Sequence, residues 1–280
     1  SRISLELTVL LLKLAKCTKG KINSFMKQII GEYSDHMTTN TYVWYEKNRK
    51  NADEVHSHDY FQLNYVEEGY QYFHIEQKIY LVPQNHVIWI PANKLHRTTS
   101  EAKTVNPMLI LFKETFKEDF YNDIHVFVAP PILKEMMLYA SKWNKFLVED
   151  KEQKIFLNSM LYSLPHFCDE NHNLELPVLV DKRLIPVSEY IHFHYSTNFN
   201  LNELTDKANM SARNLQRIFK QETGITLQKY MQLVRILKSI ELIDTNNFTL
   251  SEIAYQVGYK SLSAFTASYF AVTKTKPKRK

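Results

Sequence analysis

Two stretches near the carboxyl end of the chain decide its fold: NLNELTDKANMSARNLQRIFKQETG at residues 200–224 and TLSEIAYQVGYKSLSAFTASYFAVTK at residues 249–274. Each begins with a polar residue followed three positions later by a glutamate, which is typical of a helix amino terminus. Each then places apolar residues at helical spacing, followed by a residue that accepts positive φ, Asn209 or Gly258, and by a serine that opens a second helix. The copies are offset by 49 residues before the turn and by 50 after it. The pattern therefore predicts one helix-turn-helix unit that occurs twice.

The second helix of such a unit lies in the major groove of DNA. Arg, Asn and Gln side chains, which pair with the edges of guanine and adenine, occupy the faces of this helix that its apolar residues leave free. The alternative is that these side chains form a solvated helix face. The predicted DNA contacts are Ser211, Arg213, Asn214, Gln216, Arg217 and Lys220 in the first unit, and Lys260, Ser261, Ser263 and Thr266 in the second.

The charge of the chain is concentrated in the same region. Residues 197–280 carry 13 Lys and Arg against 6 Asp and Glu, whereas residues 1–196 carry 22 against 24. A basic domain with two helix-turn-helix units predicts double-stranded DNA as the partner. The second helix of the second unit, residues 261–270, has no Arg or Lys. We therefore expect this half to read bases weakly and to grip phosphate through its amino end, Lys260 and the basic tail.

The C-terminal region resembles the DNA-binding domain of AraC-type transcription regulators over residues 198–277. The residues that carry the resemblance are Leu204-Thr205, Met210-Ser211, Leu215, Arg217, Phe219-Lys220, Gly224, Tyr230 and Arg235, followed by Ile253-Ala254, Val257-Gly258-Tyr259, Phe265, Tyr269 and Pro277. Thr205, Leu227 and Lys274 depart from the family pattern. The resemblance implies a seven-helix domain that binds an operator, and contact with RNA polymerase if the protein is an activator rather than a repressor.

The region from residue 41 to residue 128 is rich in short runs of Tyr, Val, Ile, Phe and Trp separated by turn residues. Strands are predicted at Thr41–Glu46, Tyr60–Glu67, Tyr70–Glu76, Lys78–Val82, His86–Pro91 and Met108–Phe112. Closely spaced strands with no helix between them favour an antiparallel sandwich or barrel. The predicted fold class is α+β, with a cupin-like β-barrel and flanking helices followed by the all-α domain.

His56 and His58, four residues before Gln62, and His96 farther on resemble the motif of the cupin barrel that many AraC-type regulators carry as a sensor domain. Metal-binding cupins use two histidines, a glutamate and a distant histidine. Because neutral Gln62 takes the place of the carboxylate, we expect no metal and no other cofactor. We also expect no enzymatic activity. A metal-dependent cupin enzyme with an accessory DNA-binding domain is an alternative on the same residues.

A small barrel can enclose one small ligand, and aromatic rings with amide groups suit a sugar or another polar organic effector. The alternative is that the aromatic residues are packed core, in which case the regulator would be controlled by its abundance. Which side chains face inward depends on the strand register. The predicted effector pocket consists of Trp44, His56, His58, Gln62, Asn64, Tyr72, His74, Trp89 and His96.

The predicted domains are an N-terminal extension at residues 1–36, the sensing barrel at 37–128, a helical connector at 129–195 and the DNA-binding domain at 196–280. Met37 is a candidate start of the protein. The two helices between residues 130 and 167 have wide apolar stripes. Similar helices form the dimer contact in AraC-type regulators, so we expect a homodimer; ordinary intramolecular packing is the alternative.

The cysteine usage fits a reducing compartment, so we expect a protein of the cytoplasm, and the resemblance implies a bacterial one. The two cysteines, Cys17 and Cys168, are too far apart to suggest a disulfide framework or a zinc knuckle. The most apolar stretch, residues 5–15, is shorter than the ~20 residues that cross a bilayer. The sequence therefore predicts an effector-controlled DNA-binding regulator without a membrane segment.

Overall fold

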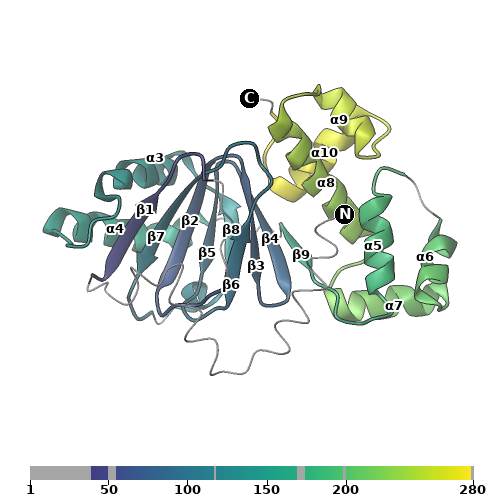
Figure 1. Ribbon diagram of the computed structural model, residues 1–280, viewed down its shortest axis with the longest axis horizontal. Helices are drawn as coiled ribbons and strands as arrows, with labels where there is room; N and C mark the ends of the chain where they lie inside the picture. Colours follow the sequence, from purple (N-terminus) through teal and green to yellow (C-terminus); the bar gives the residue numbers. More distant parts are fainter. Residues whose placement is uncertain (1–38, 50–54, 117, 169–173, 198–199, 279–280) are drawn as a thin grey trace.

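The computed structural model describes residues 39–49, 55–116, 118–168, 174–197 and 200–278. The predicted N-terminal extension and Met37 lie outside the described residues. Two antiparallel sheets form the first half of the molecule, and helices form the second half (Figure 1). None of the described helices is both long enough and apolar enough to cross a membrane.

The strands pair into a five-stranded and a four-stranded sheet that face each other. The first has the order β1 (Thr41–Tyr45), β7 (Asn106–Phe112), β2 (Phe61–Glu68), β5 (His86–Ile90) and β8 (His125–Val128), and the second has the order β6 (His96–Thr99), β3 (Tyr70–Ile75), β4 (Lys78–Pro83) and β9 (Glu175–Pro177). The ladders between the described strands form two separate sheets rather than one closed ring. Of the two predicted arrangements, the sandwich therefore describes this domain better than the barrel.

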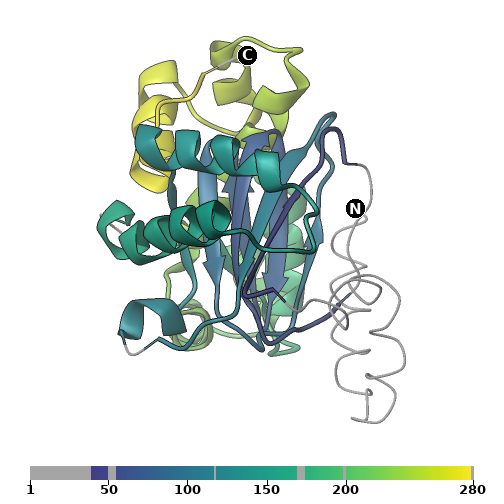
Figure 2. The ribbon, with the colours of Figure 1, turned by 90° about the vertical axis from the view of Figure 1, so that its left-hand side faces the viewer.

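Side chains alternate between the two faces of the five-stranded sheet. One set, which includes Leu63, Trp89 and Ile110, packs in a core with α3 (Pro131–Ala140) and α4 (Lys151–Phe167). Figure 2 shows these two helices lying across the outer face of that sheet. The other set faces the four-stranded sheet. The sheet is therefore covered on both sides, which explains why every residue of β5 is buried.

The predicted connector, residues 129–195, is divided among three places. Helices α3 and α4 belong to the five-stranded sheet, and the short strand β9 adds to the edge of the other sheet by pairing with β4. Helix α5 (Ile185–Phe193) packs against α6 (Leu201–Ala208) and α8 (Leu227–Thr245). Strands β6, β8 and β9 were not predicted as strands. Each has only three or four residues, too few for a period of its own to be recognised.

The C-terminal half consists of α6 (Leu201–Ala208), α7 (Ala212–Thr223), α8 (Leu227–Thr245), α9 (Leu250–Gln256) and α10 (Leu262–Thr273). Their apolar faces meet around α8, which lies between the two helix-turn-helix units. The same continuous core includes residues on the outer face of the four-stranded sheet, such as Ile79 and Leu81. The DNA-binding helices therefore pack onto the outer side of that sheet (Figure 1).

Candidate DNA interface and sensing site

The first helix-turn-helix unit consists of α6 and α7. Asn209 ends α6 in the left-handed conformation, with φ of 51°. The Ser211 hydroxyl then accepts a hydrogen bond from the backbone N–H of Asn214 and begins α7. Leu215 and Phe219 are fully buried against the rest of the domain, so the opposite side of α7 faces solvent.

The solvent side of α7 carries the predicted base-reading residues. Arg213, Gln216, Arg217 and Lys220 are exposed. The Arg217 guanidinium donates to Asn214 Oδ1 at 2.9 Å and to Gln221 Oε1 at 3.2 Å. These contacts hold the guanidinium flat along the helix, where its remaining N–H groups are available to a base or a phosphate.

The second unit consists of α9 and α10. Thr249 and Glu252 form a complete capping box at the start of α9. Gly258 makes the turn with φ of 87°, and the Ser261 hydroxyl accepts the N–H of Ala264 at 3.2 Å to begin α10. Lys260 and Ser263 are exposed and Thr266 is partly buried. The predicted contacts of this unit thus surround the amino end of α10.

Helix α8 joins the two units and contacts both neighbouring segments. The Arg235 guanidinium donates to the carbonyl of Tyr195 at 2.7 Å and to that of Thr197 at 3.0 Å, which fixes the segment that leads into α6. On another side of α8, Glu241 Oε1 accepts a hydrogen bond of 2.5 Å from the Tyr72 hydroxyl on β3. Burial and the Glu241 carboxylate raise the pKa of Tyr72 well above its usual value. Tyr72 therefore links the sheet to the DNA-binding half as a neutral donor.

The strand register places four of the predicted pocket residues on the inner side of the sandwich. Gln62 pairs with Leu111, which pairs with Tyr42, and Asn64 pairs with Leu109, which pairs with Trp44. Residues that pair directly across strands point to the same face. Trp44, Gln62 and Asn64 therefore share the face that looks toward the other sheet. His96 reaches them from that sheet, since its Nε2 lies 3.1 Å from Gln62 Oε1.

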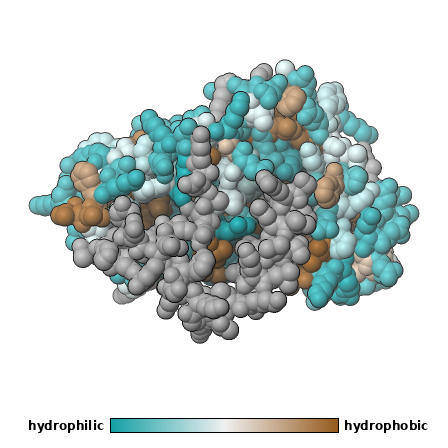
Figure 3. Space-filling view, in the orientation of Figure 1, coloured by the Kyte–Doolittle hydropathy of each residue, from teal (hydrophilic) through white to brown (hydrophobic). Residues whose placement is uncertain are grey.

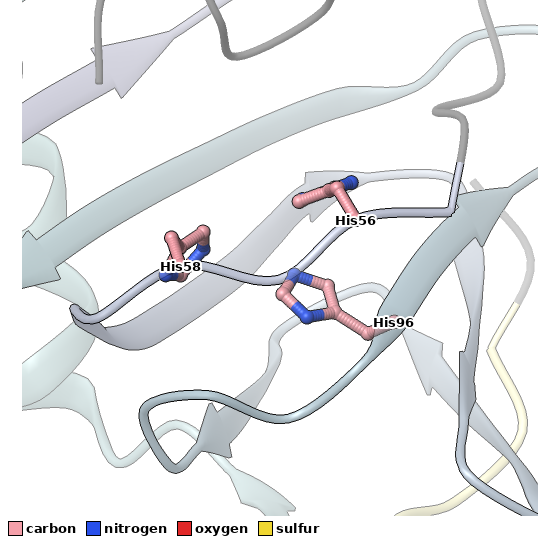
Figure 4. Close-up of side chains that lie close together, drawn as sticks. All are labelled: His56, His58 and His96. Atoms are coloured by element: carbon pink, nitrogen blue, oxygen red, sulfur yellow. The ribbon is translucent and has the colours of Figure 1, made fainter. Parts of the chain in front are cut away.

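His56, His58 and His96 lie close together at one end of this space (Figure 4). Their ring centroids are 4.4 to 5.8 Å apart. Backbone hydrogen bonds of 2.9 and 2.8 Å, exchanged between His56 and His96, hold the segment before β2 against β6. His58 Nε2 lies 2.9 Å from Gln62 Oε1, and the Gln62 amide is 2.6 Å from Asn64 Oδ1. The structure thus joins five predicted residues into one polar cluster: His56, His58, Gln62, Asn64 and His96.

The protonation of this cluster follows from its backbone contacts. Nδ1 of His58 lies 2.9 Å from the carbonyl of Tyr60, and Nδ1 of His96 lies 2.8 Å from that of Lys94. A carbonyl only accepts, so each Nδ1 carries the proton. Burial lowers the pKa of His58 and lowers that of His96 to about 3, so both rings are neutral near pH 7. Their Nε2 lone pairs therefore point at Gln62.

Neutral rings require a donor between them, and the Gln62 amide supplies one when its NH₂ group is turned toward the two Nε2 atoms. The two orientations of an amide have nearly the same shape, so this turn needs no repacking. The Asn64 amide can turn with it. In this orientation the cluster contains both donors and acceptors, which suits a ligand with hydroxyl groups because each hydroxyl both donates and accepts.

The same geometry tests whether a cupin-type metal would fit. The three imidazoles offer donor atoms within 4.8 Å of one another. However, the Gln62 amide stands between His58 and His96 at hydrogen-bonding distances of 2.9 and 3.1 Å, whereas zinc binds imidazole nitrogen at about 2.0–2.1 Å. An ion bound to both of these Nε2 atoms would have to displace that amide, and it would gain no anionic ligand from this set. The residues do not fit a metal ion in this arrangement.

Three predicted pocket residues lie elsewhere, so their assignment to the pocket is corrected. Trp89 pairs with Leu63 and lies in the core beneath α3 and α4, where its indole N–H donates to the Tyr121 carbonyl at 3.1 Å. Tyr72 and His74 lie on the face of β3 opposite to Phe73 and Ile75, toward the DNA-binding helices. The physical reason is register: in each strand these residues are one position out of phase with the inward set.

Sequence reasoning missed an inward amide, Gln71, and a residue that contacts a predicted one, Glu241. Gln71, 4% exposed, lies on the inner face of β3, and its Oε1 has no hydrogen-bond partner among the described residues. The alternation within β3 could have indicated it once the face of Phe73 was known. Glu241, the partner of Tyr72, lies on a helix with no binding motif around it, so no local signal pointed to its role.

Comparison with known proteins agrees with these two parts. A family model described as an AraC-like ligand binding domain matches residues 45–133, and one described as a helix-turn-helix domain matches residues 204–279. The HTH-type transcriptional regulator YbfI of Bacillus subtilis is 23% identical over 223 residues, which cover 74% of this chain and 79% of that protein. The HTH-type transcriptional activator RhaS of Citrobacter koseri is 28% identical over 89 residues, 32% of each chain.

Among solved structures, ToxT from Vibrio cholerae shares 14% identity at a TM-score of 0.35, covering 85% of this chain and 95% of that one. The DNA-binding domain of AdpA in complex with a target DNA shares 24% identity at a TM-score of 0.32, covering 34% and 86%. The two matching family models and the named relatives agree with the twofold helix-turn-helix and the sheet domain described above. The chain belongs to the AraC-type family of DNA-binding transcription regulators, with an AraC-like ligand-binding domain ahead of its helix-turn-helix domain.

Proposed function

We propose that operator binding by this regulator is controlled by a small polar organic effector, such as a sugar, held between the two sheets. The observation that carries the proposal is the polar cluster of His56, His58, Gln62, Asn64 and His96, all buried except the partly buried His58, on the face that Tyr42 and Trp44 share. Buried amides lower stability unless they are hydrogen-bonded. A fold that keeps five polar side chains inside an apolar sandwich gains from them when a ligand engages them.

The orphaned Oε1 of Gln71 supports the same proposal. It is a buried acceptor on the inner face of the sheet opposite Gln62 and Asn64. An unsatisfied buried acceptor lowers stability by about 1–3 kcal/mol. A ligand hydroxyl would satisfy it, while the face of Trp44 offers the apolar surface against which a sugar ring packs.

The test uses the full-length protein and a panel of sugars, polyols and other polar metabolites. Trp44 lies on the inner face, and no tryptophan lies in residues 196–280, so intrinsic fluorescence reports on the sensing half. The correct effector should change tryptophan emission and operator affinity over the same concentration range. Gln62→Leu should weaken both responses, whereas Gln84→Leu, an exposed amide in the β4–β5 turn, should leave them unchanged. A ligand that saturates the domain without altering operator affinity would refute control by an effector.

The two rival interpretations are separated by metal content and by ligand dependence. We expect mild chelation to leave folding and operator binding intact, because no anionic ligand joins the three histidines. One equivalent of metal that survives chelation would instead favour a metal-dependent cupin enzyme with an accessory DNA-binding domain. If no ligand alters operator affinity, control by protein abundance is favoured.

We propose further that the regulator is a homodimer joined through α3 and α4. Large apolar side chains are exposed on and between these helices: Ile132, Tyr139, Phe146, Leu147, Val148, Ile155 and Tyr162. Figure 3 shows hydrophobic surface at the end of the molecule where α4 lies. Exposed apolar clusters of this kind commonly mark protein interfaces.

In sedimentation experiments, Ile155→Glu should shift the protein toward monomer. The control is Lys154→Glu, which changes the charge by more but removes no apolar side chain, and it should leave the dimer intact. A monomeric wild type at micromolar concentration would refute the proposal.

A further inference from the structure

Helices α7 and α10 hold equivalent positions but present different chemistry. Beyond the turns the two units are offset by 50 residues, so Leu215 and Phe219 correspond to Phe265 and Tyr269. All four of these side chains are buried. Because the buried faces correspond, the solvent faces correspond as well, and the two helices can be compared position by position.

The solvent face of α10 has lost every charge that α7 carries. Arg213, Arg217 and Lys220 are replaced by Ser263, Ala267 and Phe270, and the amides of α7 are replaced by the small residues Ala264, Thr266 and Ala271. Ser263, Ala264 and Ala267 are exposed, and Phe270 is 50% exposed. The solvent face of α10 therefore offers a partner methyl groups, one aromatic ring and two hydroxyl groups.

The flanks of α10 are basic. Lys260 is exposed directly before the helix, and Lys274, Lys276 and Lys278 are exposed after it. Lysines at the edges of a groove-binding helix contact phosphates and set its orientation, while the centre of the helix meets the bases. This arrangement of cations around an uncharged centre matches a DNA groove better than a protein surface.

Among the base edges of the major groove, thymine offers an apolar group, the C5 methyl, and Ala, Thr and Phe are the side chains that contact it. Alanines also let the helix approach the groove floor closely. We propose that the second helix-turn-helix reads thymine methyl groups through Ala264, Ala267 and Phe270, so that this half of the operator is specified by thymines rather than by the guanine and adenine edges that α7 reads. The proposal rests on the DNA-binding function, and it states which base specifies the part of the operator that α10 contacts.

The experiment begins with selection of bound duplexes from a random pool by the full-length protein. Footprinting of Arg213→Ala and Phe270→Ala variants then assigns each segment of the selected site to α7 or α10. In the α10 segment, each thymine is replaced in turn by uracil, which removes only the methyl group. Burial of one methyl corresponds to about a fourfold change in affinity. We expect a loss of that size for one or more thymines in the α10 segment, and no loss for thymines in the α7 segment.

Variants identify the side chains. In Phe270→Ala and Ala267→Ser proteins the effect of uracil should shrink, while Ser251→Ala, exposed at the start of α9, should retain it. If the protein selects a sequence but uracil has no effect in the α10 segment, the proposal is overturned while DNA binding stands. If the α10 segment has no preference and Phe270→Ala only weakens association with another protein, this face is a protein interface. If no sequence is selected at all, the DNA-binding function itself fails.

Discussion

Asn209 and Gly258 make the same turn in the two units, yet only one of them requires glycine. Both have positive φ, which asparagine tolerates better than other residues with a side chain. A Cβ at Gly258 would lie 2.6 Å from the Ser196 carbonyl oxygen and 3.0 Å from Arg235 Cζ. The second turn therefore packs closely against residues 195–197, the segment whose carbonyls accept hydrogen bonds from Arg235.

Gly258→Ala should consequently lower the free energy of unfolding by about 2–4 kcal/mol, since it adds backbone strain to a contact with main-chain atoms that cannot easily move. Asn209→Ala, which adds only strain, should lower it by about 1 kcal/mol. Urea denaturation of the two variants beside wild type measures both. Equal losses would show that the contact with Ser196 does not matter.

At the scale of elements, α7 and α10 were predictable because cap, period and turn all agree, and both helices begin directly after the predicted serines. Strand β9 could not be predicted, because three residues are too few to show a period. The side of the sheet on which Trp89 lies could not be predicted either. Every residue of β5 is buried, so alternation gives no signal, and only the pairing of Trp89 with Leu63 decides which face the side chain takes. The polar cluster was predicted through its motif, but its hydrogen bonds depend on two segments that are far apart in sequence.

The inequality of the two recognition helices also belongs to this scale. Arg213→Ala should weaken binding to the selected operator by about 1–3 kcal/mol and relax preference at one position if the side chain reads a base. Ser263→Ala should change both less, because its hydroxyl makes a weaker contact. Arg183→Ala, which removes the same charge outside the DNA-binding helices, is the control. Titrations at several salt concentrations, with a steep salt dependence for wild type, decide the matter; a larger loss from Ser263→Ala would contradict it.

For the whole molecule, the principal feature is the shared core between the four-stranded sheet and the DNA-binding helices. The Tyr72–Glu241 hydrogen bond and the bond from the Lys103 N–H to Asp244 cross this junction. A ligand alters operator binding when it favours one arrangement of the two halves or of the two subunits. This junction is where such a preference would be expressed.

Two partly buried histidines near the junction predict acid sensitivity. Burial lowers the pKa of His74 and of His192 to about 4, from an ordinary value of 6.5. Between these pH values the unfolded chain binds more protons than the folded one. The free energy of unfolding is therefore highest above pH 6.5 and decreases as the pH drops toward 4. Urea midpoints from pH 7.5 to 4.5 should show the decline, with a smaller slope in His192→Gln, whose amide can still reach the Tyr230 hydroxyl. A midpoint that rises on acidification would contradict the prediction.

Strand β9 also determines how far the two halves can separate. With β9 hydrogen-bonded to β4 and α5 packed on α8, the covalent path between them is residues 178–184. Seven residues reach roughly 25 Å when fully extended. If the DNA-binding helices separated from the sheet, this linker would keep them close to the surface they had left. Their effective concentration at that surface would be about millimolar, as for other short linkers. Redocking is then unimolecular and unaffected by dilution, whereas association through α3 and α4 weakens on dilution, so the two equilibria can be separated by changing protein concentration alone.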